Sequence, residues 1–362
     1  MGKVSIVKIN KDIKSSLYDS INLLGGLSSI INKEDIILIK PNLNDFESFT
    51  SIELTEALIQ LLIDQQVKKI FIGESTFGND KMTDLHFKKS GYYDLAQKYN
   101  IELVNFNKSE ITEIIVKNPF LIDKLKIAKE VLRATKIINL PIMKVHYATG
   151  VTLSLKNLKG MLFGNEKRRF HETGLDKSIA DLNNSVNIDL NIVDCISCME
   201  TMGPKGGNIF SLDMIISGKN RGEVDLVCSK IMGYDLDEVK HLKYYCEHNN
   251  IHFNNIEILG EKLAEVIHPF KKVNMKKIIP DLINIYNNDA CSSCENALLL
   301  SFKFLEEKIK KSTDIYMGSN IDLVDNKNIK LAFGNCCKNN KLDKFIKGCP
   351  PYPFELKKVL EE

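Results

Sequence analysis

Apolar and polar positions alternate along the first 110 residues in a way that predicts strands separated by helices. Short apolar runs at 4–9, 36–40, 69–73 and 101–105 have the length and composition of buried strands. Between them, the segments 14–24, 53–64 and 85–98 repeat their apolar residues with the period of a helix. Alternating strands and helices are typical of a parallel sheet covered by helices.

The same alternation continues less regularly between residues 113 and 260. We expect strands at 136–140, 191–194 and 214–217, and helices at 152–162, 224–232 and 238–248. The pattern therefore predicts an α/β fold with a parallel or mixed sheet and covering helices over residues 1–270. It leaves open whether this part is one large unit or two packed α/β units divided near residue 110. Residues 271–362 form a smaller cysteine-rich C-terminal segment.

Composition narrows the class of protein. A chain of 362 residues exceeds the usual limit of one hydrophobic core, and 44% hydrophobic with 27% charged residues is ordinary for a globular protein. Lys plus Arg number 49 against 47 Asp plus Glu, which argues against a general nucleic-acid binder. The N-terminus lacks the apolar core of a signal peptide, and no apolar run is long enough to cross a membrane. We therefore expect a cytoplasmic chain with no nucleic-acid or membrane partner.

Five of the nine cysteines lie in the C-terminal segment. Cys291 and Cys294 are separated by two residues, a spacing that lets two thiolates face one metal centre. Cys336 and Cys349 each follow a glycine or a glycine–asparagine pair and can complete a four-thiolate set when the chain folds back. Because the later cysteines do not form a second pair spaced by two, the pattern favours a 4Fe-4S cluster over zinc.

Other interpretations of the cysteines remain. The five cysteines of the C-terminal segment can be buried as small hydrophobic residues. Alternatively, they can bind a zinc ion that holds the segment together. Cys337 is an alternative to Cys336, which we prefer because adjacent cysteines bind one cubane only with strain. Cys195 and Cys198 repeat the two-residue spacing without further cysteines nearby, so core packing or a redox-sensitive dithiol is favoured there.

Polar residues cluster at two predicted strand ends and in a basic stretch at 144–171. Lys40 and Asn42 follow one strand, and Glu74 follows another, where ligands bind in open α/β sheets. Lys156 and Lys159 would share a helix face, so an anion between them would relieve their repulsion. His146 and His171 are candidate proton donors. The same residues can also be explained without a functional site, as ordinary turn residues and a solvent-exposed basic face.

An ordered series of motifs resembles the family called domain of unknown function 362. The matching residues are Lys40-Pro41-Asn42-Leu43, Gly73-Glu74-Ser75, His146, TLSLKNLKG at 152–160, His171, Val193-Asp194, Gly203-Pro204 and Asp225. Members of that family frequently carry iron–sulfur clusters, commonly through an attached ferredoxin-like module. The resemblance therefore implies that this chain binds such a cluster. This chain lacks the dense cysteine run of that module, and Cys195 stands where the family pattern has glycine.

A second, shorter resemblance concerns the end of the chain. Gly348-Cys349-Pro350-Pro351 with Pro353 resembles the ligand loop of the small cluster-bearing subunits of respiratory complex I and hydrogenases. In those proteins the cysteine holds a four-iron cluster, so the resemblance implies a ligand role for Cys349.

Together these observations predict an iron–sulfur oxidoreductase that passes electrons from a 4Fe-4S cluster to a small carboxylate or phosphate. Cys291, Cys294, Cys336 and Cys349 would hold the cluster, which an electron donor such as ferredoxin would reduce. Lys40, Lys156 and Lys159 would neutralise the substrate, and His146 and His171 would supply protons. The remaining predicted substrate-binding residues, which would orient the substrate or the groups around it, are Asn42, Glu74, Asn157 and Asp194. Two alternatives are a non-redox lyase or dehydratase using the cluster as a Lewis acid, and a non-catalytic electron-transfer protein docking an acidic partner. The sequence leaves open whether flavin binds and whether the chain forms a homo-oligomer.

Overall fold

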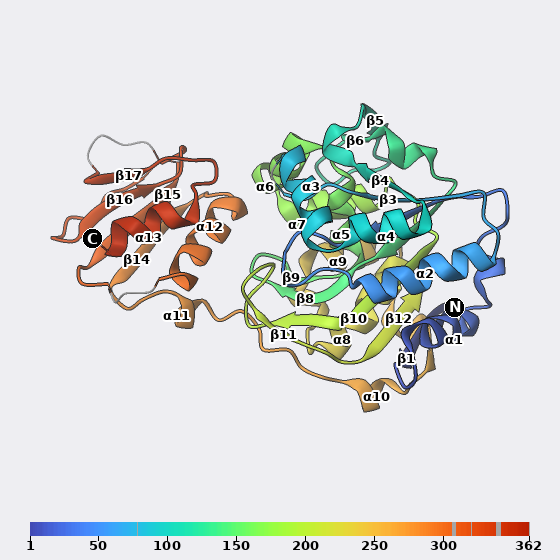
Figure 1. The fold of residues 1–362 in the computed structure, drawn as a ribbon. Coiled ribbons are helices and arrows are strands. Elements are labelled where there is room, and N and C mark those ends of the chain that lie inside the picture. The colour runs from blue at the N-terminus through green and yellow to red at the C-terminus, as the bar shows by residue number, and fades with distance from the viewer. Residues whose placement is uncertain (78, 306–308, 320, 338–341, 362) are drawn as a thin grey trace. The chain divides into compact units, whose positions relative to one another are not determined.

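The computed structural model describes residues 1–77, 79–305, 309–319, 321–337 and 342–361. The chain forms two compact units, Met1–Lys272 and Val273–Glu362. Both are built from strands that alternate with helices (Figure 1).

A mixed sheet forms the centre of the first unit. Its main path runs in the order β13-β1-β12-β10-β7-β2-β3-β4, and β12 is antiparallel to both of its neighbours. The neighbours from β10 to β4 are all parallel, so their carboxyl ends lie along one edge. The strands are β1 (Gly2–Lys8), β2 (Ile36–Pro41), β3 (Lys69–Glu74), β4 (Glu102–Asn105), β7 (Lys136–Leu140), β10 (Leu190–Glu200), β12 (Met214–Gly218) and β13 (Ile256–Gly260).

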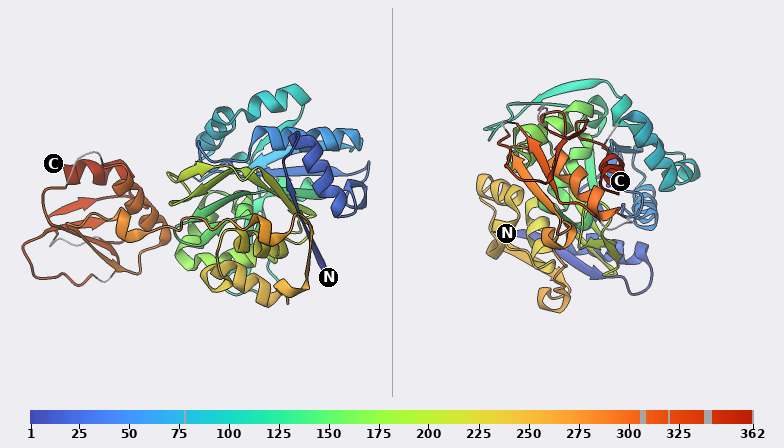
Figure 2. Two further views of the ribbon diagram at one scale, coloured as in Figure 1. Left: turned by 90° about the horizontal axis from the view of Figure 1, so that it is seen from below. Right: turned by 90° about the vertical axis from the view of Figure 1, so that its left-hand side faces the viewer.

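Helices cover both faces of this sheet (Figure 2). The principal core packs α1, α2, α3 and α4 against apolar residues of the central strands, and α5 and α8 pack on the sheet with α7 and α9 beside them. The helices are α1 (Ile13–Leu23), α2 (Ile52–Asp64), α3 (Asp80–Lys89), α4 (Tyr92–Tyr99), α5 (Ser154–Asn157), α6 (Gly164–Thr173), α7 (Leu175–Asn183), α8 (Arg221–Ile231), α9 (Lys240–His248) and α10 (Leu263–Val266).

Short strands extend the sheet near its carboxyl edge. The strand β8 (Ile142–His146) pairs with the far half of β10 and with β9 (Gly150–Thr152), while β11 (Asn208–Phe210) pairs with the end of β10. A separate hairpin joins β5 (Ile111–Ile115) and β6 (Lys124–Ala128). The 3-10 helix η4 (Leu158–Met161) follows α5 directly. These additions bring residues 142–171 to the ends of β2 and β3.

The second unit contains a parallel sheet in the order β14-β15-β16-β17, four strands in the described residues. Alternate residues face opposite sides: Ile315 and Leu331 join the core under the helices, whereas Tyr316 and Ala332 join a small cluster on the other face. The elements are α11 (Met275–Ile278), β14 (Ile283–Asn288), α12 (Ser292–Lys303), β15 (Thr313–Gly318), β16 (Ile329–Phe333), β17 (Lys344–Ile346) and α13 (Pro353–Glu361).

The structure confirms the expected α/β class and corrects two helices. The single helix predicted at 85–98 is wrong, because the chain breaks at Gly91, which has a left-handed φ of 78° and begins α4. The single helix predicted at 152–162 is also wrong. The strand β9 runs to Thr152, and only one turn of α-helix precedes η4.

Candidate functional site

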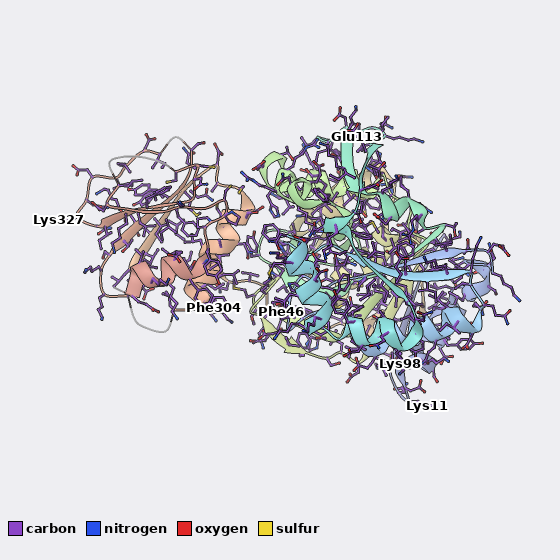
Figure 3. The ribbon with its side chains drawn as sticks, turned by 45° about the horizontal axis from the view of Figure 1, so that its top comes forward. Lys11, Phe46, Lys98, Glu113, Phe304 and Lys327 are labelled. Carbon is purple, nitrogen blue, oxygen red and sulfur yellow. The ribbon has the colours of Figure 1, made fainter. Side chains whose placement is uncertain are left out.

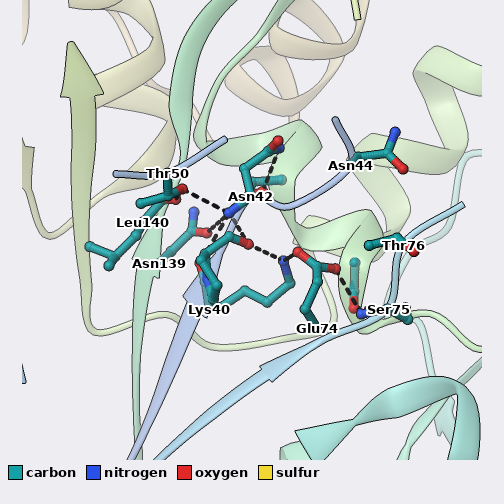
Figure 4. Close-up of polar contacts among 12 residues, drawn as sticks. Lys40, Asn42, Asn44, Thr50, Glu74, Ser75, Thr76, Asn139 and Leu140 are labelled. Atoms are coloured by element: carbon teal, nitrogen blue, oxygen red, sulfur yellow. Dashed lines mark hydrogen bonds and ion pairs between the residues drawn. The ribbon is translucent and has the colours of Figure 1, made fainter. Parts of the chain in front are cut away.

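The carboxyl ends of β2 and β3 meet at a buried ion pair. The ammonium of Lys40 donates to Glu74 Oε2 at 2.6 Å and to the Pro41 carbonyl at 2.7 Å, and the second oxygen of Glu74 accepts from the Ser75 backbone N–H at 2.8 Å (Figure 4). Burial lowers the pKa of Lys40 and raises that of Glu74, and the attraction between the two charges opposes both shifts. These contacts give Lys40 and Glu74 a structural role, and contact with substrate stays a prediction.

The 3-10 helix η4 and the residue after it are hydrogen-bonded to Ser75, which adjoins this ion pair. The Ser75 N–H and hydroxyl both donate to the Gly160 carbonyl at 2.9 Å, and the hydroxyl also reaches the Leu162 carbonyl at 2.7 Å. A Cβ placed on Gly160 would lie 1.9 Å from Glu74 Oε1 and 2.5 Å from Lys40 Nζ. Only glycine lets the backbone approach this closely, so the backbone beside Lys159 is held firmly in place.

A line of buried asparagines connects the sheet to α5. Asn42 donates to the Asn157 side-chain oxygen at 2.9 Å, and Asn157 donates to the Asn139 oxygen at 2.8 Å and to the Lys40 carbonyl at 3.2 Å. Asn139 continues the line to Asn191 at 3.0 Å. Asn157 is therefore fully engaged in positioning α5. Asn42 keeps a side-chain oxygen without a hydrogen-bond partner in the described part of the chain.

Four residues predicted to act in chemistry lie together above this network. Lys159 Nζ is 3.0 Å from His171 Nε2. Each of His146, Lys156 and His171 has its pKa lowered by burial and then by neighbours from the same group, and Lys159 is a neighbour of all three. The predicted residues thus come from β8, α5, η4 and α6 to one place. We call this group, with Lys144 and Lys167, the basic site.

Sequence reasoning did not select Lys144, Lys167 or Lys205. Lys144 lies within the buried strand β8 and donates to the Ser48 carbonyl at 3.2 Å. Lys167 on α6 donates to the carbonyls of Ser75 and Thr76, and Lys205 adds positive charge beside Lys144. A lysine inside an otherwise apolar strand is a signal that could have identified Lys144, because such a charge needs a buried partner.

Burial weakens the hold of these lysines on their protons. It lowers the pKa of Lys144 to about 8 and the pKa values of Lys159 and Lys167 to about 7. Lys156, Lys159 and His171 retain partial exposure, so solvent and small ions can reach this edge of the site. The basic site holds several cations near Glu74, and small changes of charge alter its protonation.

Two aspartates fix the surrounding loops. Asp194 accepts from the backbone N–H groups of Ser51 at 2.7 Å and Ile196 at 2.8 Å, which ties the start of α2 to β10. Asp225 accepts from the N–H groups of Ser154 and Leu155 and so caps α5. These bonds account for the burial of Asp194, and a substrate contact for it stays a prediction.

The predicted cluster ligands gather in the second unit. Cys291 is the N-cap of α12, and Cys294 lies in the first turn of that helix. A hydrogen bond with Cys291, burial, and the negative charge of Cys291, Cys349 and Cys336 raise the pKa of Cys294. A Cβ on Gly334 would lie 3.2 Å from Cys294 Sγ, so this glycine keeps the backbone close to the sulfur. Cys291, Cys336 and Cys349, which follow β14, β16 and β17, therefore lie close enough to Cys294 for their charges to affect it.

Cys337 is directed elsewhere. Its thiol donates to the Tyr316 carbonyl at 2.9 Å and packs with Tyr316 and Ala332, on the sheet face opposite the core that includes Cys294. Cys336, its neighbour, is exposed and is the one that affects Cys294. The geometry separates the roles of these adjacent residues.

The donor set consists of thiols, which suit either zinc or an iron–sulfur cluster. Tetrahedral zinc with bonds of about 2.3 Å needs sulfurs about 3.8 Å apart, whereas each thiolate of a cubane binds a different iron. Cys294 is hydrogen-bonded to Cys291, and no three His, Cys, Asp or Glu side chains in the described residues are close enough to hold one metal ion. The 4Fe-4S cluster, with Cys291, Cys294, Cys336 and Cys349 as its ligands, stays a prediction.

Cys195 and Cys198 lie in the first unit and are fully buried. Burial, then a hydrogen bond and the charge of Cys198, raise the pKa of Cys195, with Cys228 also nearby. A buried thiol with a raised pKa is a poor nucleophile, which agrees with a packing role for Cys195.

Comparison with known proteins places the chain in a family. A sequence profile described as "Domain of unknown function (DUF362)" matches residues 37–230. The chain belongs to this family. The matched region contains every residue of the basic site, from Lys144 to His171, together with Lys40 and Glu74, whereas the cysteines of the second unit lie outside it.

One protein with a similar sequence is a thylakoid-associated protein of Synechocystis sp. It is 28% identical over 233 residues, which are 61% of this chain and 70% of the relative. No helix in the described ranges has the length and apolar character that crossing a membrane requires.

Two solved structures match the chain at low similarity. The lactate racemase apoprotein from Thermoanaerobacterium thermosaccharolyticum has a TM-score of 0.41 and 14% identity, covering 87% of this chain and 69% of that one. A protein from Thermotoga maritima has a TM-score of 0.40 and 9% identity, covering 84% and 70%. Similarity at this level assigns no activity to the chain.

Proposed function

We propose that this chain is an iron–sulfur oxidoreductase that reduces a small carboxylate or phosphate bound at the basic site. The observation that supports it most is the gathering of lysines and histidines around Lys159 at the edge where parallel strands end. Such a concentration of cations is costly unless an anion is bound for part of the protein's working cycle.

Anion binding would change the protonation of the site. Lys159 and Lys167 have pKa values of about 7, so each is only partly charged at neutral pH. A bound carboxylate or phosphate favours the charged form of every neighbouring amine and raises these pKa values. Binding therefore takes up protons from solvent, which distinguishes this site from a pre-charged surface patch.

The same groups can provide the protons of a reduction. A two-electron reduction that leaves the substrate charge unchanged consumes two protons. Ammonium groups with pKa values near 7 to 8 are well matched to donate at neutral pH. His146 and His171 are neutral in these surroundings, so they are not the first proton donors, and each can only hydrogen-bond a neighbouring ammonium or substrate group.

The second unit would provide the electrons. Cys291, Cys294, Cys336 and Cys349 would hold a 4Fe-4S cluster, which carries one electron at a time from a reduced donor such as ferredoxin. The exposure of Cys336 favours one alternative, in which three thiolates hold the cluster and a Lewis-acidic iron acts in a lyase or dehydratase.

Calorimetry tests the anion site without knowledge of the substrate. Inorganic phosphate titrated into the full chain at pH 7.5, in two buffers of different ionisation enthalpy, is expected to show proton uptake. Lys156→Met should reduce the affinity by about tenfold, the value of one lost charge contact of about 1.4 kcal/mol. The matched control Lys98→Met removes an exposed lysine and should leave binding unchanged. Binding without proton uptake, or unaffected by Lys156→Met, would contradict the proposal.

Turnover tests the redox part. Under anaerobic conditions, protein reduced by ferredoxin is mixed with a panel of small carboxylates and phosphates, and reoxidation is followed by absorbance. Reoxidation by at least one anion that Lys156→Met abolishes is the expected result. If Cys336→Ala retains both cluster and a non-redox elimination activity, the lyase alternative replaces this proposal.

A further inference from the structure

We propose that Lys159 is a reversible carbamylation site, where the side-chain amine binds CO2 as a carbamate in competition with the anionic ligand. The competition rests on the proposed anion site, whereas carbamylation itself rests on the surroundings of Lys159 alone.

The first argument is the partner of the amine. Lys40 is neutralised by Glu74, and Lys167 donates to two backbone carbonyls. Lys159 instead lies 3.0 Å from an imidazole nitrogen of His171, and no carboxylate in the described residues forms an ion pair with it. An amine that faces a neutral imidazole has no negative charge beside it to hold its proton, so it can lose that proton to solvent and expose its lone pair.

The second argument is the charge around the amine. The titratable groups that face Lys159 are His146 on β8, Lys156 on α5, and Lys167 and His171 on α6. All of these carry positive charge or none. They disfavour an ammonium at Lys159 and favour an anion in its place, because opposite charges attract at short range. Burial lowers the pKa of Lys159 to about 7, so neutral amine is present at physiological pH.

The third argument is position. The Gly160 carbonyl is held by Ser75, and Lys159 packs near the Phe170 ring, 5.8 Å from its centre, so the amine is held at the half-exposed edge of the basic site. A small neutral molecule such as CO2 can reach this edge without bringing a charge into the site.

The chemistry balances without a redox partner. The neutral amine attacks the carbon of CO2, an N–C bond forms, and one C=O π bond opens to a carboxylate. The proton released from nitrogen passes to solvent at the partly exposed edge of the site, because the pKa of His171, about 2, is too low for the imidazole to keep it. The side chain changes from a cation or neutral amine to an anion, which the neighbouring lysines stabilise.

Carbamate and bound anion exclude each other by linkage. A phosphate or carboxylate in the site raises the pKa of Lys159 and so removes the neutral amine that CO2 needs. Conversely, a carbamate places a negative charge where the anion would bind. CO2 would thereby inhibit anion binding at the basic site reversibly.

Carbon-13 magnetic resonance tests the inference on the full chain. With labelled bicarbonate at pH 7.5, a carbamate resonance is expected in the wild type and in the control Lys11→Arg, which changes an exposed lysine (Figure 3). Lys159→Arg should lack this resonance, apart from any signal of the Met1 α-amine. The signal should rise between pH 6 and 8, whereas an exposed lysine with a pKa of about 10.4 requires more alkaline conditions. Methylation of the carbamate followed by peptide mapping should place the added mass on Lys159.

The outcomes separate the two proposals. A resonance that is absent, or that survives in Lys159→Arg, overturns carbamylation. A Lys159 resonance that phosphate does not reduce, although calorimetry shows phosphate bound, overturns the competition. If phosphate does not bind and the resonance is present, the proposed anion site fails while carbamylation stands.

Discussion

The two units place their distinctive side chains at the same position, the carboxyl ends of parallel strands, but balance them in different ways. In the first unit, the charges of Lys40, Glu74 and Lys167 are met by hydrogen bonds from the protein itself. In the second, Cys294 is surrounded mainly by other thiols. The polar groups of the first site are therefore largely satisfied by the protein alone. In the second unit, the neighbouring thiols can all lose their protons together only around a positively charged metal centre.

The largest expected effect in the first unit comes from breaking its buried ion pair. Glu74→Gln leaves Lys40 fully buried without a counter-charge and should lower the free energy of unfolding by about 3–5 kcal/mol. Urea unfolding of the first unit, followed by circular dichroism, measures the change. Lys98→Met breaks the exposed pair with Glu56 and should cost less than about 1 kcal/mol. Similar costs for the two variants would show that the buried pair does not organise the site.

A smaller effect is expected from Gly160→Ala. The added Cβ would overlap the Glu74 carboxylate, so we expect a loss of about 1–3 kcal/mol and weaker phosphate binding, because Lys159 is displaced. Gly164→Ala adds a methyl group into open space, although its left-handed φ carries a cost of about 1 kcal/mol. Retention of full phosphate affinity by Gly160→Ala would count against the close contact between Gly160 and the ion pair.

A pH dependence with a definite sign provides a further test. Lys144, Lys159 and Lys167 have folded pKa values of about 8, 7 and 7, well below the unfolded value of about 10.4. Between these limits the unfolded chain binds more protons, so stability rises as pH increases from about 7 towards 10. Thermal unfolding of the ligand-free protein should occur at higher temperature at pH 8.5 than at pH 6.5. Phosphate should stabilise more at pH 6.5, and Lys159→Met should flatten both trends.

Much of the fold was predictable because its strands and helices satisfy local patterns. The strand at 136–140 and the helix at 53–64 are examples in which apolar period and tertiary packing agree. The prediction failed at 152–162, where Asp225 and Asn157 fix a short helix by contacts that are distant in sequence. In the second unit, the cysteines predicted a metal centre, whereas the alternation of strands and helices was not predicted.

The candidate site was predictable in its residue types but less in its internal roles. His146, Lys156, Lys159 and His171 were identified from charge and spacing, and they lie together. Asn157 and Asp194 were assigned to substrate, yet their polar atoms bind backbone or neighbouring asparagine groups. Sequence shows which polar groups exist, whereas only the fold shows which are already satisfied by the protein.

The central claim is that Cys336, and not the adjacent Cys337, joins Cys291, Cys294 and Cys349 in holding a 4Fe-4S cluster. The most direct measurement is iron and sulfide per chain after anaerobic purification of the wild type, Cys336→Ser and Cys337→Ser. We predict about four of each in the wild type and in Cys337→Ser, and loss or loosening of the cluster in Cys336→Ser. A protein without iron, one that contains zinc instead, or loss of iron from Cys337→Ser alone would contradict the account.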